Sequence, residues 1–314
     1  MSSLNFQNFP KRDNKEIRNI IRAPEGHLIV SCDYSQLEAR CLAMASKDKV
    51  FCQAIWDDSD THQKWAERLV YYSPQLKDKF PSKDPNKPLK GLRDDVKNML
   101  VFKTFYGASK SSVAKHYIEL GMSQEDIDLV FEEFWDTYKG VKEWQKTLLT
   151  YFDKYGYVKS LTGRKRRQPL SPNKVINFPI QSTASLDICL GAGNRLSNEA
   201  YIQNKPQYQY RINVHDDLTF YVPEKTLIDD ITYIGYVMTQ PIFSFINVPL
   251  EIEFSIGRNW GSMVDTGKIK TTEFYDYEDN CGESIWIPKP ANKFVHTMLK
   301  ASRESIINRI KHTL

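Results

Sequence analysis

The chain lacks the sequence features of secreted, membrane-spanning and disulfide-bonded proteins. Its 314 residues contain no apolar run approaching the roughly 18 residues that a transmembrane helix needs. Residues 1–6 carry neither the charged nor the apolar segment of a signal peptide. The five cysteines are odd in number and include no CxxC pair, so neither a disulfide framework nor a zinc site is expected. We therefore expect a cytoplasmic protein with no membrane partner.

The composition indicates a globular protein with buried cores, since 41% of the residues are hydrophobic and 12% aromatic. Cys32 and Cys189 lie in apolar stretches and are expected to be buried thiols. The net charge is only +4, but Lys159 and the run Arg164–Arg167 bring cations together within a few residues. Such a cluster is typical either of a solvated surface or of a groove that binds nucleic acid.

Two acidic clusters adjoin stretches that read as strands. Asp33-Tyr34-Ser35-Gln36-Leu37-Glu38-Ala39-Arg40 follows the β-rich residues 28–32, and Val214-His215-Asp216-Asp217 precedes residues 218–222. A carboxylate at a strand end and one in a hairpin turn can meet on one sheet. Such a pair can hold two divalent cations about 3.5–4 Å apart, which is the arrangement for in-line phosphoryl transfer.

The order of expected elements indicates an α+β fold with strands in the outer thirds and helices in the middle. Helices are expected over 46–72, 92–150 and, after Pro179, up to residue 200, and a proline-rich loop over 73–91. Ser123 begins one helix as its cap. Further strands are expected over 155–162, 209–214 and 250–256.

The two acidic clusters resemble the catalytic motifs of family A DNA polymerases, the bacterial DNA polymerase I group. The first octet departs from the family only at Ala39, and similar motifs follow in order from Asn5 to Trp260. The resemblance implies a palm with an antiparallel sheet (residues 1–45 and 155–263), mostly helical fingers (46–154) and a C-terminal extension (264–314). It also implies two Mg²⁺ ions held by Asp33, Asp216 and the carbonyl of Tyr34, with Asp217 as a further catalytic carboxylate.

The resemblance further implies a set of nucleotide contacts. Glu38 corresponds to the residue that leaves no room for a ribose 2′-hydroxyl, and Gln36 lies beside it. The fingers residues expected to contact the incoming dNTP are His62, Arg93, Lys97, Phe102 and Tyr106, with Lys97 also catalytic. Four residues separate Lys97 from Phe102, where the family has three. A π-bulge could absorb the extra residue, and we favour it over the alternative that Val101 takes the place of the aromatic.

The same resemblance predicts contacts with a DNA primer-template. Asn177 and Gln181 would contact minor-groove edges near the primer end, together with His215. Arg164, Arg166 and Arg167 would bind backbone phosphates. The leading hypothesis is thus a DNA-templated DNA polymerase. A binding-only subunit and a single-subunit RNA polymerase remain as alternatives, although Glu38 argues against the latter.

The resemblance covers only palm and fingers, with no thumb, no exonuclease domain and no upstream Thr-Gly-Arg element. We therefore expect either a split viral polymerase, acting in the host cytoplasm, or a truncated one, with a separate chain that supplies thumb and exonuclease. A helical stripe in the extension could pack on its own domain or bind that chain: Val295, Leu299, Ile306, Ile310 and Leu314.

Overall fold

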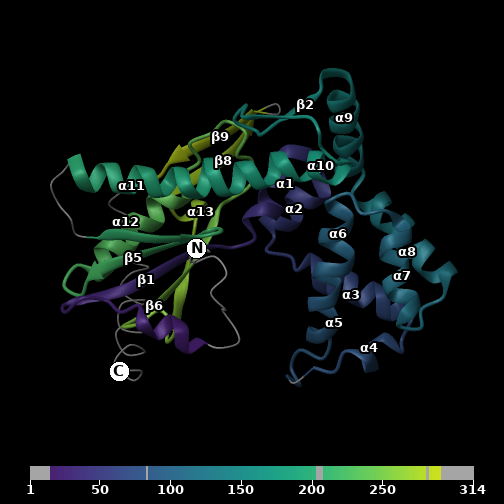
Figure 1. Cartoon of the computed structure of the whole chain (residues 1–314), viewed down its shortest axis with the longest axis horizontal. Coiled ribbons are helices and arrows are strands. Elements are labelled where there is room, and N and C mark those ends of the chain that lie inside the picture. Colours follow the sequence, from purple (N-terminus) through teal and green to yellow (C-terminus); the bar gives the residue numbers. More distant parts are fainter. Residues whose placement is uncertain (1–14, 83, 203–207, 281–282, 291–314) are drawn as a thin grey trace. The chain divides into compact units, whose positions relative to one another are not determined.

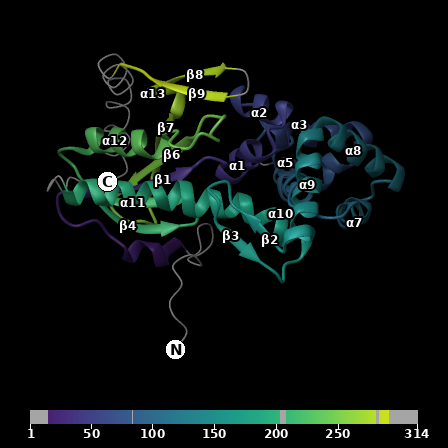
Figure 2. The same ribbon diagram turned by 90° about the horizontal axis from the view of Figure 1, so that it is seen from above.

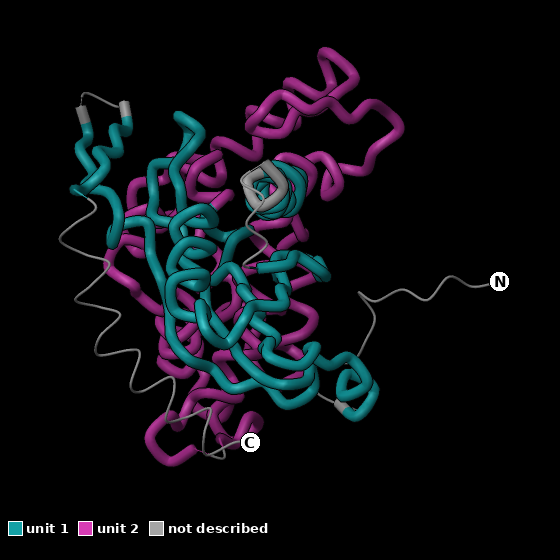
Figure 3. Tube along the Cα trace, turned by 90° about the vertical axis from the view of Figure 1, so that its left-hand side faces the viewer, with its two compact units in different colours: residues 1–40, 182–314 teal, residues 41–181 magenta. Residues whose placement is uncertain are grey.

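The computed structural model describes residues 15–82, 84–202, 208–280 and 283–290, and the chain divides into two compact units (Figure 3). The first unit comprises residues 1–40 and 182–314, and the second comprises residues 41–181. The helix α1 (Leu37–Ser46) spans the first crossing between them. The motif at Asn5 and the stripe from Val295 to Leu314 lie outside the described residues.

The first unit contains a five-stranded sheet in the order β4-β5-β1-β6-β7, and every neighbouring pair is antiparallel. The expected strands at 28–32, 209–214, 218–222 and 250–256 are confirmed as parts of this sheet. Their bounds are β1 (His27–Tyr34), β4 (Gln209–Val214), β5 (Asp217–Pro223) and β6 (Glu251–Gly257), and β7 (Val264–Lys270) adds the fifth strand.

The two faces of the sheet differ in chemistry because strand side chains alternate. On one face Cys32 is paired in register with Leu218 and Phe254, all of them buried. On the other face Ser31 is paired with Thr219 and with Ser255. The apolar face therefore belongs to the core, and the other face carries polar side chains.

Helices of the first unit cover the apolar face (Figures 1 and 2). The helix α12 (Leu227–Thr239) packs on β5, β6 and β7, and α11 (Leu190–Ile202) packs on β4 and α12. The buried Tyr34 hydroxyl donates a hydrogen bond to the Met238 carbonyl of α12 at 2.6 Å. After β7 come the short helix α13 (Thr271–Phe274) and the hairpin of β8 (Tyr275–Asn280) and β9 (Glu283–Pro288).

The second unit is mainly helical, as the resemblance to fingers predicts. Its helices are α2 (Lys49–Trp56), α3 (Thr61–Tyr72), α4 (Leu76–Lys79), α5 (Lys90–Val96), α6 (Phe102–Phe105), α7 (Lys110–Glu119), α8 (Gln124–Thr137) and α9 (Lys139–Tyr155). The short helix α4 lies within the predicted proline-rich loop. The Ser123 hydroxyl accepts a hydrogen bond from the Asp126 amide at 3.0 Å, so the predicted cap of α8 is confirmed.

The second unit also contains the hairpin of β2 (Tyr157–Lys159) and β3 (Lys165–Arg167), followed by α10 (Pro172–Gln181). The predicted start of this helix after Pro179 is wrong, because Pro179 lies inside α10. Proline removes a helix hydrogen bond, but Pro179 is buried together with Val175, Ile176 and Ile180, and this burial offsets the loss. The helix continues as the π-helical segment η4 (Ser182–Cys189), which the sequence did not indicate.

The α+β class with an antiparallel sheet and a helical insertion agrees with the expectation. The boundaries between the units fall at 40/41 and 181/182, whereas the predicted palm and fingers boundaries fall at 45/46 and 154/155. The hairpin and α10 stay with the second unit because Phe152, Val158 and Val175 form one buried cluster. The predicted domain names remain predictions.

Candidate functional site

The predicted carboxylates gather at one end of the three central strands of the sheet in the first unit. Asp33, near the end of β1, is paired in register with Asp217 on β5 and with Glu253 on β6. Residues directly opposite in an antiparallel pair share a face, so the three carboxylates form a row on the polar face. The sheet therefore joins the two acidic clusters, which are far apart in the sequence.

The turn between β4 and β5 carries Asp216. The Tyr34 amide donates to the Asp216 carbonyl at 3.1 Å, which ties this turn to the end of β1. The Asn213 side-chain amide spans the turn and donates to the carbonyls of His215 at 3.3 Å and Asp217 at 3.2 Å. His215 has a φ of 57°, in the left-handed region that few non-glycine residues adopt. Strain of this kind is concentrated at functional sites.

Asp216 lies in a negative environment. Burial raises the pKa of its carboxyl, and the negative charges of Asp33, Glu38 and Asp217 raise it further, to about 6. The same interactions show that these four carboxylates lie near one another. A cation bound among these four carboxylates would relieve their mutual repulsion.

Asp217 is held by hydroxyl groups of its own sheet. One carboxylate oxygen accepts a hydrogen bond from Ser31, and the other accepts one from Thr219 at 2.9 Å. Arg18, in the 3₁₀ segment η2 (Lys15–Ile20), is buried and stacks on the Trp260 ring at 4.1 Å. Burial lowers the pKa of Arg18, whereas the charge of Asp217 raises it.

Gln36 and Glu38 follow β1 in a second strained turn. Gln36 is exposed and has a φ of 53°, and Glu38 lies half-buried in the first turn of α1. Gln36 and His215, both predicted site residues, thus occupy left-handed positions on the two segments that flank the carboxylates.

The oxygen atoms around Asp33 and Asp216 suit magnesium, which prefers carboxylate and carbonyl oxygens and retains water and phosphate ligands. Asp33, Asp216 and the Tyr34 carbonyl supply only oxygen. Over the described ranges, no group of three or more His, Cys, Asp or Glu side chains is arranged as a metal cluster. A donor set of this kind leaves coordination positions for water and for substrate phosphates.

Arg93, predicted to contact the dNTP, lies in the second unit close to two acidic side chains. It forms ion pairs with Asp60 at 2.6 Å and with Asp94 at 3.1 Å. Asp60 also caps α3 by accepting from the Gln63 amide at 2.9 Å. The first of these ion pairs joins the start of α3 to α5.

His62 is buried, with 4% of its surface exposed, and neither ring nitrogen has a hydrogen-bond partner among the described residues. Its ring meets the Phe102 ring edge to face at 5.3 Å. Burial lowers the pKa of His62 to about 4, and the positive charges of Arg93 and Lys97 act in the same direction. His62 is therefore neutral at pH 7 in this fold.

The expected π-bulge is confirmed as the segment η3 (Lys97–Val101). The Phe102 amide donates to the Lys97 carbonyl, which is five residues earlier and not four. As a result, the Lys97 ammonium lies 5.6 Å from the centre of the Phe102 ring, and that ring stacks on Tyr106 at 6.0 Å. Val101 is 1% exposed, so the alternative in which it replaces the aromatic is wrong.

The predicted nucleic-acid residues lie on the hairpin and on α10. Arg164, Arg166 and Arg167 are exposed, and Arg166 lies over the Phe178 ring at 5.8 Å. On α10, Gln181 is exposed and the buried carboxamide oxygen of Asn177 has no hydrogen-bond partner among the described residues. His215 is exposed, but it lies in the first unit.

Several residues that contact the candidate site residues were not predicted from the sequence. Asp60 pairs with Arg93, Asn213 spans the metal-site turn, and Arg18, Ser31 and Thr219 act on Asp217. Ser31 and Thr219 could have been found from strand alternation, because each is two residues from an aspartate of the site. No signal in the sequence marks Asn213 or Arg18.

None of the helices in the described part has the length and apolarity to cross a bilayer, as expected. The predicted burial of Cys32 and Cys189 is also confirmed, and both are free thiols.

The model of DNA polymerase family A matches residues 1–262. DNA polymerase I of Chloroflexus aurantiacus is 28% identical over 82% of this chain and 27% of its own length. The thermostable DNA polymerase I of Thermus filiformis is 28% identical over 82% of this chain and 30% of its own length. The chain therefore spans less than a third of these relatives.

Among solved structures, the polymerase domain of Pol1 from M. smegmatis, in complex with DNA primer-template and dNTP, superposes with a TM-score of 0.67. It is 26% identical, and the match covers 83% of this chain and 45% of that one. Since the family model matches most of the sequence and the fold agrees, the chain belongs to DNA polymerase family A.

Proposed function

We propose that this chain carries the catalytic centre of a DNA-templated DNA polymerase that adds dNTPs to a primer 3′-hydroxyl. The observation that supports it best is the meeting of Asp33 and Asp216 at one end of the central strands of the sheet. The M. smegmatis relative, which binds DNA primer-template and dNTP, supports the same partners for this chain.

In this proposal Asp33, Asp216 and the Tyr34 carbonyl would hold two magnesium ions. Magnesium, when bound, would lower the pKa of the primer 3′-hydroxyl and balance charge on the pyrophosphate leaving group. The chain's own contribution is positional. The sheet register keeps the carboxylates side by side, and the hydroxyls of Ser31 and Thr219 keep Asp217 from turning.

The second unit would bind the triphosphate through its own cations. Arg93 is planar and can exchange Asp60 for phosphate oxygens in a bidentate contact. Lys97 adds a point charge, and Phe102 and Tyr106, stacked beside it, would cover the base and sugar. His62 is neutral and its buried ring nitrogens lack a hydrogen-bond partner among the described residues, so a phosphate oxygen that reached the ring would find an unused donor.

Glu38 would select deoxynucleotides by occupying the space beneath the sugar. Arg164, Arg166 and Arg167 would contact backbone phosphates, and Asn177 and Gln181 would contact the minor groove, with His215 near the primer end.

Primer extension tests the proposal directly. With a DNA primer-template, dNTPs and magnesium, we expect the wild type to extend the primer. The rate of extension should fall at least about a thousandfold in Asp216→Asn, because the amide lacks the negative charge that would hold the metal ions. Asp229→Asn is the matched control, since Asp229 is an exposed carboxylate on α12. Equal activity of the two variants would refute the assignment of Asp216.

The same assay separates the alternatives. A binding-only subunit would retain primer-template without extending it, and an RNA polymerase would prefer rNTPs. For the DNA polymerase, Glu38→Ala should raise ribonucleotide incorporation about tenfold or more relative to deoxynucleotides. Unchanged sugar selectivity in a nucleotide competition would remove Glu38 from this role, with Glu67→Ala on the exposed side of α3 as control.

A further inference from the structure

The edge strand β7 lies beyond residues 1–262, the part that matches the family, yet it forms part of the sheet that carries the carboxylates. It pairs with β6 so that Lys270 is opposite Glu251 and Lys268 is opposite Glu253. Its end is fastened by Thr271, whose hydroxyl accepts from the Leu250 amide at 2.8 Å. The extension thus presents two lysines to two glutamates of the family's own strand.

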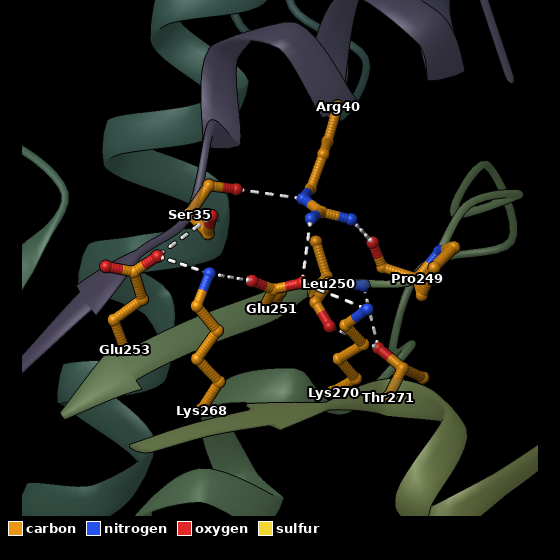
Figure 4. A network of polar contacts seen from close by, with 9 residues as sticks. All are labelled: Ser35, Arg40, Pro249, Leu250, Glu251, Glu253, Lys268, Lys270 and Thr271. Carbon is orange, nitrogen blue, oxygen red and sulfur yellow. Dashed lines mark hydrogen bonds and ion pairs between the residues drawn. The ribbon is translucent and has the colours of Figure 1, made fainter. Parts of the chain in front are cut away.

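Glu251 is the centre of an ionic network (Figure 4). Only 4% of it is exposed, and its two carboxylate oxygens are shared among three cations. Lys268 binds one oxygen at 2.9 Å, and Lys270 and Arg40 bind the other at 3.4 Å each. Burial would raise the pKa of Glu251, but the hydrogen bond from Lys268 and the three positive charges hold it below its ordinary value.

Arg40 connects this network to the turn between Asp33 and Glu38. Its guanidinium is buried and donates to the Ser35 carbonyl at 2.8 Å and to the Pro249 carbonyl. The Ser35 amide donates to the Glu251 carbonyl at 2.8 Å. Ser35 is therefore held on both sides, and it lies two residues after Asp33 and three before Glu38.

The lysines act on the orientation of Glu251 as well as on its charge. A buried guanidinium requires a partner of opposite charge. Without β7, Arg40 and Glu251 would still neutralise each other. Lys268, however, binds the Oε1 oxygen, whereas Arg40 binds Oε2, and Lys268 also binds Glu253 at 2.7 Å. Because the Lys268 side chain is 55% exposed, its ion pairs add little to global stability. These ion pairs should therefore affect the structure mainly around Glu251 and the Ser35 turn.

We propose that Lys268 and Lys270 are positioning residues for nucleotide addition: through Glu251 and Arg40 they hold the Ser35 turn, and thereby place Asp33 and Glu38. This gives the strand after the family-matched residues a part in metal and sugar recognition. It rests on the proposed polymerase function, but the contacts that carry it can be tested without activity.

The test compares the full chain with Lys268→Met/Lys270→Met, Lys268→Arg/Lys270→Arg and the control Lys289→Met. Lys289 also lies in the extension, and it pairs with Asp276 at 3.2 Å. The first measurement is hydrogen exchange of residues 34–38. In the double variant Lys268→Met/Lys270→Met (the methionine pair), we expect the exchange of these residues to rise about tenfold, because the turn opens more easily. The double variant Lys268→Arg/Lys270→Arg (the arginine pair) and Lys289→Met should stay near wild type.

The second measurement is the selectivity between dNTPs and rNTPs, with the KM for dNTP and the rate constant determined separately. We expect the methionine pair to lose about tenfold in selectivity and to change KM more than the rate constant. Unchanged exchange, or exchange raised equally by Lys289→Met, would overturn the proposal. Raised exchange with unchanged selectivity and KM would overturn it too.

Two further outcomes remain interpretable. If the methionine pair fails to fold, the single change Lys268→Met, at an exposed head group, is read by the same criteria. If the wild-type chain shows no polymerase activity, the proposed function fails, while hydrogen exchange still decides whether β7 holds the Ser35 turn.

Discussion

At the scale of single residues, the charges that act most strongly on Asp216 are all negative. Asp33, Glu38 and Asp217 raise its pKa together with burial, so at pH 7 its ionised form is held at a cost in folding free energy. Such a cost is typical of sites that await a cation. Activity and stability should therefore respond to Asp216 in opposite directions.

We expect Asp216→Asn to be more stable than wild type in the presence of a chelator, by about 1–3 kcal/mol. Magnesium should raise the unfolding temperature of the wild type, because a ligand of the folded state stabilises it, and should leave that of the variant unchanged. Thermal unfolding with and without magnesium measures both effects. An amide variant that is less stable in chelator would contradict the account of repulsion.

His62 predicts a dependence of stability on pH. Its pKa is about 4 in the folded protein, against the ordinary 6.5, because burial disfavours the charged ring. Between these values the unfolded chain binds a proton that the folded chain does not, so stability falls as the pH falls from about 6.5 to 4.

Relative to His62→Gln, the wild type should lose up to roughly 3 kcal/mol of unfolding free energy across that pH interval. Denaturant titrations of both proteins at several pH values check this. Parallel pH profiles would show that His62 becomes protonated without a penalty in the folded state.

At the scale of elements, the π-helical segment η3 shows how one inserted residue can be absorbed locally. The Phe102 amide donates to the carbonyl of Lys97, five residues earlier, and this places the Phe102 ring on the same side of the helix as Lys97. Removing one exposed residue from within the bulge should convert it to regular α-helix and keep that alignment.

We therefore expect deletion of Asn98 to change the affinity for dNTP by less than about threefold, since both helical forms present the same face. Deletion of Lys103, which lies in α6 after the bulge, should rotate Tyr106 by about 100° relative to Phe102 and weaken dNTP binding about tenfold or more. Nucleotide titration measures both. Equal losses in the two deletions would mean that the bulge itself is required.

At the scale of the whole molecule, a net charge of +4 is too small to predict where nucleic acid binds. What matters is the gathering of exposed arginines on the hairpin of β2 and β3. Binding to a primer-template should therefore depend on a few local cations and weaken with salt.

Replacing Arg164, Arg166 and Arg167 with alanine should reduce the slope of log affinity against log salt by up to about 2.7, or roughly 0.9 for each phosphate that is no longer neutralised. The matched control replaces Lys77, Lys79 and Lys87, which are also exposed, and it removes the same amount of positive charge. Fluorescence anisotropy at several salt concentrations gives the slopes. Equal slopes in both variants would indicate a response to total charge alone.

The predicted chain that supplies thumb and exonuclease, and the viral origin, stay predictions. So do the individual roles assigned to the site residues.

By itself the sequence determined four of the five strands in the main sheet, most helices, the cap at Ser123 and the identity of the two acidic clusters. These depend on local patterns: alternation, turn residues and motif spacing. The bulge after Lys97 was predicted from the resemblance to the family, because one residue more than the family spacing separates Lys97 from Phe102. The course of the helix through Pro179 was not, because burial of its neighbours outweighs a local preference.

Only the tertiary structure decided which groups meet. The opposition of Asp33 and Asp217, the pairing of Arg93 with Asp60 and the network around Glu251 join residues distant in the chain. Such contacts follow from sheet register and helix packing, which depend on the free energy of the whole core. For the same reason the sequence after Trp260 reads as a mere extension, whereas the fold makes its first strand part of the sheet that carries the carboxylates.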